Sequence, residues 1–155
     1  MTKVYQSPRD LIGQEGTTLG PTERLAIEQT RVNGFAEVTG DHQWIHVAPE
    51  RAKAGPFGAP IAHGFLTLSL IPQFFETGLT IEGARMGVNY GLNRVRFTSP
   101  VPVGSRLRAR LTLQAAEPIA PDGMQMTGLV TVEREGGDKP VCVAESLSRN
   151  FGAPA

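Results

Sequence analysis

The sequence predicts an α+β protein in which one antiparallel sheet packs against a buried helix. Two observations carry this prediction: helical spacing is concentrated in the first half of the chain, and alternating strand-like runs fill the second half. Helices and strands that occupy separate parts of a chain are typical of α+β folds. The 155 residues, 40% of them hydrophobic, suffice for one core, so we expect a single domain over residues 1–155.

The first half is expected to contain a short strand followed by a helix. The run RLAIEQ, residues 24–29, alternates apolar and polar side chains as a strand does. Thr30 is a residue type that caps helices, and Gly40 is a type that commonly follows a helix end. Between them, apolar residues follow the spacing of one helix face at Val32, Phe35 and Ala36.

A second helical region is expected beyond a loop rich in proline and glycine. Pro49 suits the first position of a single helical turn. Residues 63–78, HGFLTLSLIPQFFETG, are apolar almost all round, which is typical of a helix buried in a core. Pro72 lies within this segment and removes a backbone donor, so a kink or an early end is expected there.

The second half predicts a series of strands. Apolar residues alternate over 86–92 and continue on the opposite parity at Val95 and Phe97, which predicts a bulge near Asn93. Residues 106–111, RLRARL, alternate arginine with apolar side chains and predict a strand with one basic and one apolar face.

Two further strand-like runs complete the expected sheet. They cover about 124–134 and 139–149, and the segment EGGD between them has glycines that suit a tight reversal.

Composition and charge narrow the classes of function. Fifteen Lys and Arg balance fifteen Asp and Glu, so no net charge favours a nucleic acid or a membrane surface as partner. The N-terminus lacks an apolar signal core and no apolar run is long enough to span a bilayer, so we expect a cytoplasmic protein. The one cysteine, Cys142, lies in an apolar run and is expected to be buried and unreactive.

The stretch GDHQWIH, residues 40–46, concentrates groups that transfer protons. In a continuous helix, Asp41 and His46 would point about 140° apart, at about 100° per residue. Gly40 ends the preceding helix, so an irregular segment is able to bring the two side chains together for general acid–base catalysis. The alternative is that Asp41 caps the following turn and His46 is a structural histidine.

Gly64 is expected in the first turn of the buried helix. Backbone N–H groups there have no partner within the helix, and a residue without a side chain lets a ligand oxygen approach them closely. Such a position suits an oxygen that gains negative charge during a reaction. The alternative is that this glycine only relieves crowding between the helix and the sheet.

Three segments carry a family resemblance: FAEVTGDHQWIH at 35–46, GPFGAPIAHGFLTLSL at 55–70 and NYGLNRVRFTSPVPVGSRL at 89–107. In this order they resemble the MaoC-like dehydratase family, and specifically its NodN-like branch, which is related to (R)-specific enoyl-CoA hydratases. The resemblance covers about residues 25–115. It implies a hotdog fold, in which a curved antiparallel sheet wraps around a long central helix, and a homodimer formed through the sheets.

The resemblance also implies an activity. The enzyme would add water across the 2,3 double bond of an enoyl-CoA or acyl-carrier thioester and form an (R)-3-hydroxyacyl thioester. Asp41 and His46 match the hydratase pair, and Gly64 matches the residue whose backbone N–H receives the thioester oxygen. No cofactor is implied beyond the coenzyme A of the substrate. A hotdog acyl-CoA thioesterase and a non-catalytic acyl-thioester-binding protein are the alternatives.

The chain departs from the family pattern at two positions. Many members have Asn-Pro where this chain has Gln43 and Trp44. The pair of Asp41 and His46 is unaffected, but the wall beside it changes. Trp44 is expected either to shape the acyl pocket or to pack in the core. The sequence therefore does not identify the length or chemistry of the substrate's acyl group.

Further residues are candidates for substrate binding. His63 adjoins Gly64, although a histidine that opens a buried helix more often makes a structural hydrogen bond. Asn93, at the expected bulge, and its neighbours Arg94 and Arg96 are candidates for contacting the substrate, and the two arginines could meet its coenzyme A phosphates.

The arginines of residues 106–111 and His42 are not expected to bind substrate or to take part in catalysis. The arginines of residues 106–111 are expected on a solvated sheet face, and His42 is expected to be solvated. Asp41 and the three histidines offer metal-ligand atoms, but their spacing matches no established motif, so no metal is expected.

Overall fold

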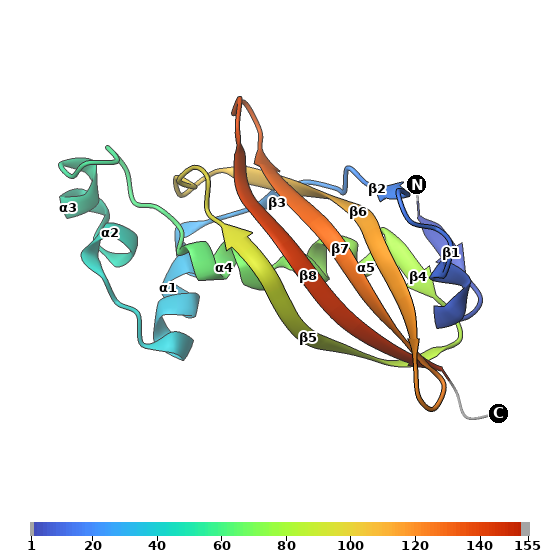
Figure 1. Ribbon diagram of the computed structural model, residues 1–155. Coiled ribbons are helices and arrows are strands. Elements are labelled where there is room, and N and C mark those ends of the chain that lie inside the picture. The colour runs from blue at the N-terminus through green and yellow to red at the C-terminus, as the bar shows by residue number, and fades with distance from the viewer. Residues whose placement is uncertain (1, 153–155) are drawn as a thin grey trace.

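The structure is a computed structural model that describes residues 2–152. Its main sheet is antiparallel and follows the order β2-β6-β7-β8-β5, with β3 also paired to β6. The long strands curve across the molecule (Figure 1). The strands are β2 (Thr18–Leu19), β3 (Leu25–Ala26), β5 (Ala84–Arg96), β6 (Arg106–Ile119), β7 (Gly123–Arg134) and β8 (Pro140–Gly152). The α+β prediction and the long strands expected from the sequence are therefore confirmed.

The buried helical segment lies against this sheet as two short helices, α4 (Gly64–Ser69) and α5 (Ile71–Glu76). The sequence predicts a kink or an early end at Pro72, and the helix breaks at Leu70, two residues earlier. Proline has no N–H and its ring crowds the carbonyl four residues earlier, so one unbroken helix is disfavoured there. The core between helices and sheet includes Leu66, Phe74, Leu107, Met124 and Val130.

Three helices gather beyond one end of the sheet (Figure 1): α1 (Gln29–Thr39), α2 (Trp44–Val47) and α3 (Pro49–Lys53). The expected helix start at Thr30 is wrong, because Glu28 occupies the N-cap position. Ile27 is held extended by backbone bonds to Ser105 and Gly104, at 2.8 and 2.7 Å, so the chain turns helical directly after it. The turn that opens at Pro49 is confirmed.

The N-terminal region contains structure that the sequence reading left irregular. A 3-10 helix, η1, covers Pro8–Leu11. Strand β1 (Lys3–Tyr5) pairs in parallel with β4 (Leu79–Ile81) in a separate two-stranded sheet. These strands have three residues each, too few to produce an alternating pattern.

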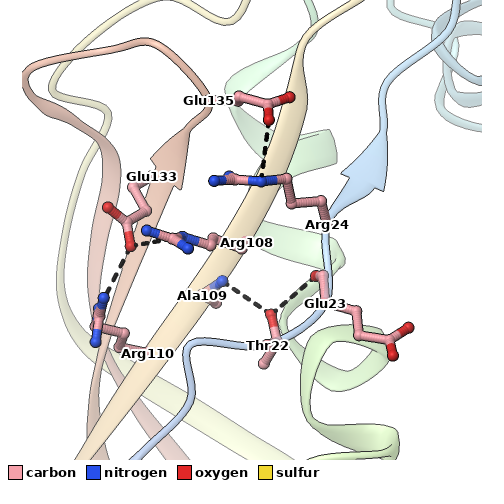
Figure 2. A network of polar contacts seen from close by, with 8 residues as sticks. All are labelled: Thr22, Glu23, Arg24, Arg108, Ala109, Arg110, Glu133 and Glu135. Carbon is pink, nitrogen blue, oxygen red and sulfur yellow. Dashed lines mark hydrogen bonds and ion pairs between the residues drawn. The ribbon is translucent and has the colours of Figure 1, made fainter.

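The two faces of β6 differ as its sequence predicts. Leu107 and Ala109 are fully buried on the core side. Arg108 and Arg110 reach the carboxylate of Glu133 on β7, at 3.0 and 3.3 Å (Figure 2). These arginines are paired on the sheet surface, which agrees with the expectation that they do not bind phosphate.

Strand β5 forms one edge of the sheet and leaves an unusual amount of apolar surface uncovered. Its register with β8 shifts between Leu92 and Val95, so the bulge expected near Asn93 is confirmed. Four large apolar side chains of β5 are 42–54% exposed: Met86, Val88, Tyr90 and Leu92.

Within residues 2–152, the structure contains no helix with the length and apolar character needed to cross a membrane.

Candidate active site

The turn after α1 brings Asp41 back toward the rest of the chain. Gly40 ends the helix in the left-handed conformation, with φ of 80°, and its N–H donates to the Ala36 carbonyl. A glycine adopts this conformation without strain, which is why the chain can reverse here. The Asp41 carboxylate then accepts a hydrogen bond from the Gln43 N–H at 3.3 Å, just before α2 begins.

His46 lies on α2 with 6% of its surface exposed. Its Nδ1 donates to the Ile61 carbonyl at 2.6 Å, since that oxygen can only accept. The neutral ring therefore keeps its lone pair on Nε2. The backbone carbonyl of His46 accepts a hydrogen bond from Gln29 Nε2 at 2.8 Å, so the histidine is held from both sides.

His63 is more deeply buried, with 2% of its surface exposed. Its Nε2 donates to the backbone carbonyl of Asp41 at 2.9 Å, and its ring stacks on His46 with 3.8 Å between centroids. Phe35 lies against its other side at 4.8 Å. His63 therefore makes the structural hydrogen bond that the sequence reading weighed against direct substrate binding, and it ties the Asp41 turn to α4.

The surroundings of His46 favour its neutral form. Burial is the main cause that lowers its pKa below 6.5, and the neighbouring His63 lowers the pKa further. The hydrogen bond to Ile61 and the charge of Asp41 act in the opposite direction without reversing the shift.

The predicted convergence of Asp41 and His46 is present. Asp41, His46 and His63 each place one nitrogen or oxygen atom within 4.8 Å of the others, and only Asp41 among them is exposed. The irregular turn and the one-turn helix α2 thus bring together two side chains that a continuous helix would point in different directions. The grouping is suited to moving a proton between a carboxylate and an imidazole. The absence of a resident metal stays a prediction.

Gly64 is the first residue of α4, as the sequence predicts, so its N–H has no acceptor within the helix. A Cβ at this position would lie 2.7 Å from the Phe97 ring. Close packing against Phe97 is therefore one reason for glycine here, and it does not conflict with an open N–H. Gly64 also lines a pocket of about 320 Å³ together with Thr67, Phe97 and Thr98.

The sequence reading missed Thr67. It lies on α4, is 2% exposed, and its hydroxyl has no hydrogen-bond partner among the described residues. Its one signal in the sequence is a hydroxyl-bearing residue in a largely apolar helical segment, a feature that Ser69 shares.

Trp44 packs locally on the helices beyond the sheet. The Arg51 guanidinium lies 4.3 Å from its ring centre, and a Cβ at Gly55 would come within 2.9 Å of that ring. Trp44 is partly buried and is not among the core residues, so it packs locally and not in the core as one expectation had it; a role in the acyl pocket stays a prediction. His42, as expected, is half exposed and lies 3.6 Å from Glu37.

The three polar residues expected near the bulge lie on β5, and none of them belongs to the group formed by Asp41, His46 and His63. Asn93, Arg94 and Arg96 are exposed, and both arginines line a pocket that also includes Thr98 and Glu145. Because Thr98 also lines the pocket at Gly64, the two pockets adjoin.

Cys142 is buried on β8, and burial raises the pKa of its thiol to about 11. A thiol with so high a pKa carries almost no thiolate near neutral pH, so the expectation of an unreactive residue is supported.

A curved antiparallel sheet packed on a central helical segment defines a hotdog fold, and Asp41 and His46 converge beyond one end of its sheet (Figure 1). Residues 12–136 match the MaoC like domain, and the chain belongs to this family. The family resemblance read from the sequence is thus confirmed.

Relatives and solved structures agree with this assignment. The chain is 50% identical over 147 residues to 3-hydroxyacyl-thioester dehydratase Z of Mycobacterium tuberculosis, covering 95% of this chain and 97% of that protein. It is 47% identical over 139 residues to Nodulation protein N of Rhizobium leguminosarum bv. viciae, covering 88% and 84%.

Two solved structures have the same fold. The R-hydratase PhaJ1 from Pseudomonas aeruginosa has a TM-score of 0.68 and 26% identity, with 90% of this chain and 83% of that chain covered. The monoamine oxidase regulatory protein from Archaeoglobus fulgius has a TM-score of 0.79, 23% identity and 99% of both chains covered.

Proposed function

We propose that this protein is an (R)-specific enoyl-CoA hydratase that also runs in reverse as a 3-hydroxyacyl-thioester dehydratase. The observation that carries the proposal is that the exposed Asp41 carboxylate and the buried His46 converge. Nδ1 of His46 is hydrogen-bonded to Ile61, and among the described residues Nε2 has no hydrogen-bond partner, so Nε2 can accept a proton. Relatives named as a 3-hydroxyacyl-thioester dehydratase and an R-hydratase support the same reaction class.

The proposed hydration begins with the thioester carbonyl oxygen accepting a hydrogen bond from the Gly64 N–H. This contact draws electron density from the β-carbon and stabilises the enolate-like transition state. Nε2 of His46 takes one proton from water as the water oxygen bonds to the β-carbon. Asp41 relays that proton to the α-carbon, so the whole water molecule is added and the pair is restored.

The two arginines of β5 are the proposed contacts for the phosphates of coenzyme A. Their pocket adjoins the Gly64 pocket at Thr98, so a long thioester can extend from one pocket to the other. Arginine suits phosphate because its planar guanidinium donates several hydrogen bonds.

The cytoplasmic location stays a prediction.

Incubation with crotonyl-CoA tests the function directly. The enoyl absorbance is expected to fall, with 3-hydroxybutyryl-CoA of (R) configuration as the product, and EDTA is expected to leave the rate unchanged. Release of free thiol from butyryl-CoA would instead indicate the thioesterase alternative. Inactivity toward enoyl thioesters of several chain lengths would contradict the hydratase assignment.

We also propose a homodimer formed through the exposed face and edge of β5. An uncovered sheet edge with large apolar side chains is a surface that soluble proteins usually pair or cover. Wild-type protein is expected to show twice the 16.6 kDa chain mass by light scattering at micromolar concentration.

Val88→Lys is expected to shift this protein toward monomer, because each copy then places a charge in the apolar interface. Gln114→Lys, on the exposed surface of β6, adds the same charge outside the interface and should leave the mass unchanged. A wild-type monomer would refute the proposal, and a dimeric Val88→Lys would move the interface elsewhere.

A further inference from the structure

We infer that the Thr67 hydroxyl is a second hydrogen-bond donor to the substrate oxygen that binds at the Gly64 N–H. This inference rests on the proposed hydratase function and deepens it, because it names a substrate-binding residue of the same site.

The position of Thr67 is the first argument. It follows Gly64 by three residues on α4, and both line the same pocket. Side chains on a helix lean toward its N-terminus, so Thr67 covers the turn that contains Gly64. The hydroxyl and the Gly64 N–H therefore serve the same region of the pocket.

The second argument is that the hydroxyl has no partner in the protein. A threonine inside a helix commonly bonds the carbonyl four residues earlier. Here the His63 carbonyl accepts the N–H groups of Leu66 and Thr67, at 3.1 and 3.3 Å, and Thr67 Oγ1 is left without a bond among the described residues. A buried hydroxyl without a partner destabilises the fold, so this position is better explained by a bond to a ligand.

The third argument is the contrast with Thr98 in the same pocket. Its hydroxyl donates to the Pro140 carbonyl and is therefore already used. The remainder of the lining is mainly apolar, with Ile61, Ala62, Phe97 and Val101 among its members. Thr67 thus offers a donor in surroundings where a hydrogen bond to a developing negative charge is strong.

Thr67→Val tests the inference because valine keeps the shape and removes the hydroxyl. Its kcat and kcat/KM for crotonyl-CoA are expected to fall at least tenfold together, since the lost bond is strongest in the transition state. Its melting temperature is expected to stay equal or rise, because the unpartnered hydroxyl is gone. Thr67→Ser restores the donor and is expected to stay within about threefold of wild type, a smaller change than loss of an oxyanion donor causes.

Further variants separate this role from a structural one. Thr67→Ala removes the hydroxyl with a smaller side chain and should lose activity as Thr67→Val does, even if either is less stable. Thr112→Val removes a threonine hydroxyl on β6, outside the pocket, and should keep wild-type rates. Wild-type rates in Thr67→Val, or an equal loss in Thr67→Ser, would overturn the inference.

Failure of the hydratase function gives a different result. Wild-type protein would then be inactive on crotonyl-CoA, and S-(2-oxopentyl)-CoA, a ketone analogue of butyryl-CoA that neither a hydratase nor a thioesterase can turn over, serves as the probe in a thermal-shift assay. A melting-temperature increase in wild type that is lost in Thr67→Val supports the contact, whereas equal shifts, or none in either protein, overturn it.

Discussion

Asp41→Asn and His46→Gln are each expected to lower kcat for crotonyl-CoA hydration by on the order of 10²–10⁴-fold, the contribution of one positioned acid or base. Asparagine keeps an oxygen that accepts the Gln43 N–H but no longer exchanges a proton. Glutamine has no ring nitrogen to take the proton of water. Initial rates at saturating substrate measure both losses.

The double variant distinguishes one proton-transfer unit from two independent groups. When two residues act as a unit, removing the second costs little once the first is gone, so the double variant should be only slightly slower than the slower single variant. His42→Gln is the matched control, because His42 is half exposed and contacts Glu37. Near-wild-type rates in both single variants would show that the stretch from Gly40 to His46 has a structural role.

The long strands could be predicted from sequence because each has one buried face over many residues. On β6, Leu107, Ala109 and Leu111 are 0–4% exposed, and they alternate with arginines. Helix α1 was predicted in place but not in its start, since the start depends on backbone bonds from Ile27 to residues near position 104. Contacts between segments so distant in the chain leave no local pattern.

The candidate site could be predicted where its geometry depends on neighbouring residues, and not where it depends on distant ones. Gly40 marks the end of a helix locally, so the convergence of Asp41 and His46 could be inferred from neighbouring residues. The bond from His63 to the Asp41 carbonyl joins residues 22 positions apart and has no counterpart in residue spacing. Thr67 was missed because a missing hydrogen-bond partner is a property of three-dimensional surroundings alone.

The environment of His46 predicts the pH dependence of the reaction. Its pKa in the folded protein lies below 6.5, mainly because burial penalises the charged ring. Catalysis needs the unprotonated Nε2, so kcat/KM is expected to be constant near pH 7 and to fall about tenfold per pH unit once pH drops below the lowered pKa. The midpoint of this acid limb should therefore lie below pH 6.5.

The same shift makes His46 a source of acid instability. A histidine whose pKa is lower in the folded state binds more protons when unfolded, so folding is favoured above the unfolded pKa of about 6.5 and weakened as pH falls through the folded value. Circular dichroism at each pH separates unfolding from loss of the base. His63→Gln removes one cause of the lowered pKa and should move the limb to higher pH. A wild-type acid limb centred above pH 6.5 would contradict the lowered pKa of His46, and activity that falls as pH rises near 7 would contradict its role as the base.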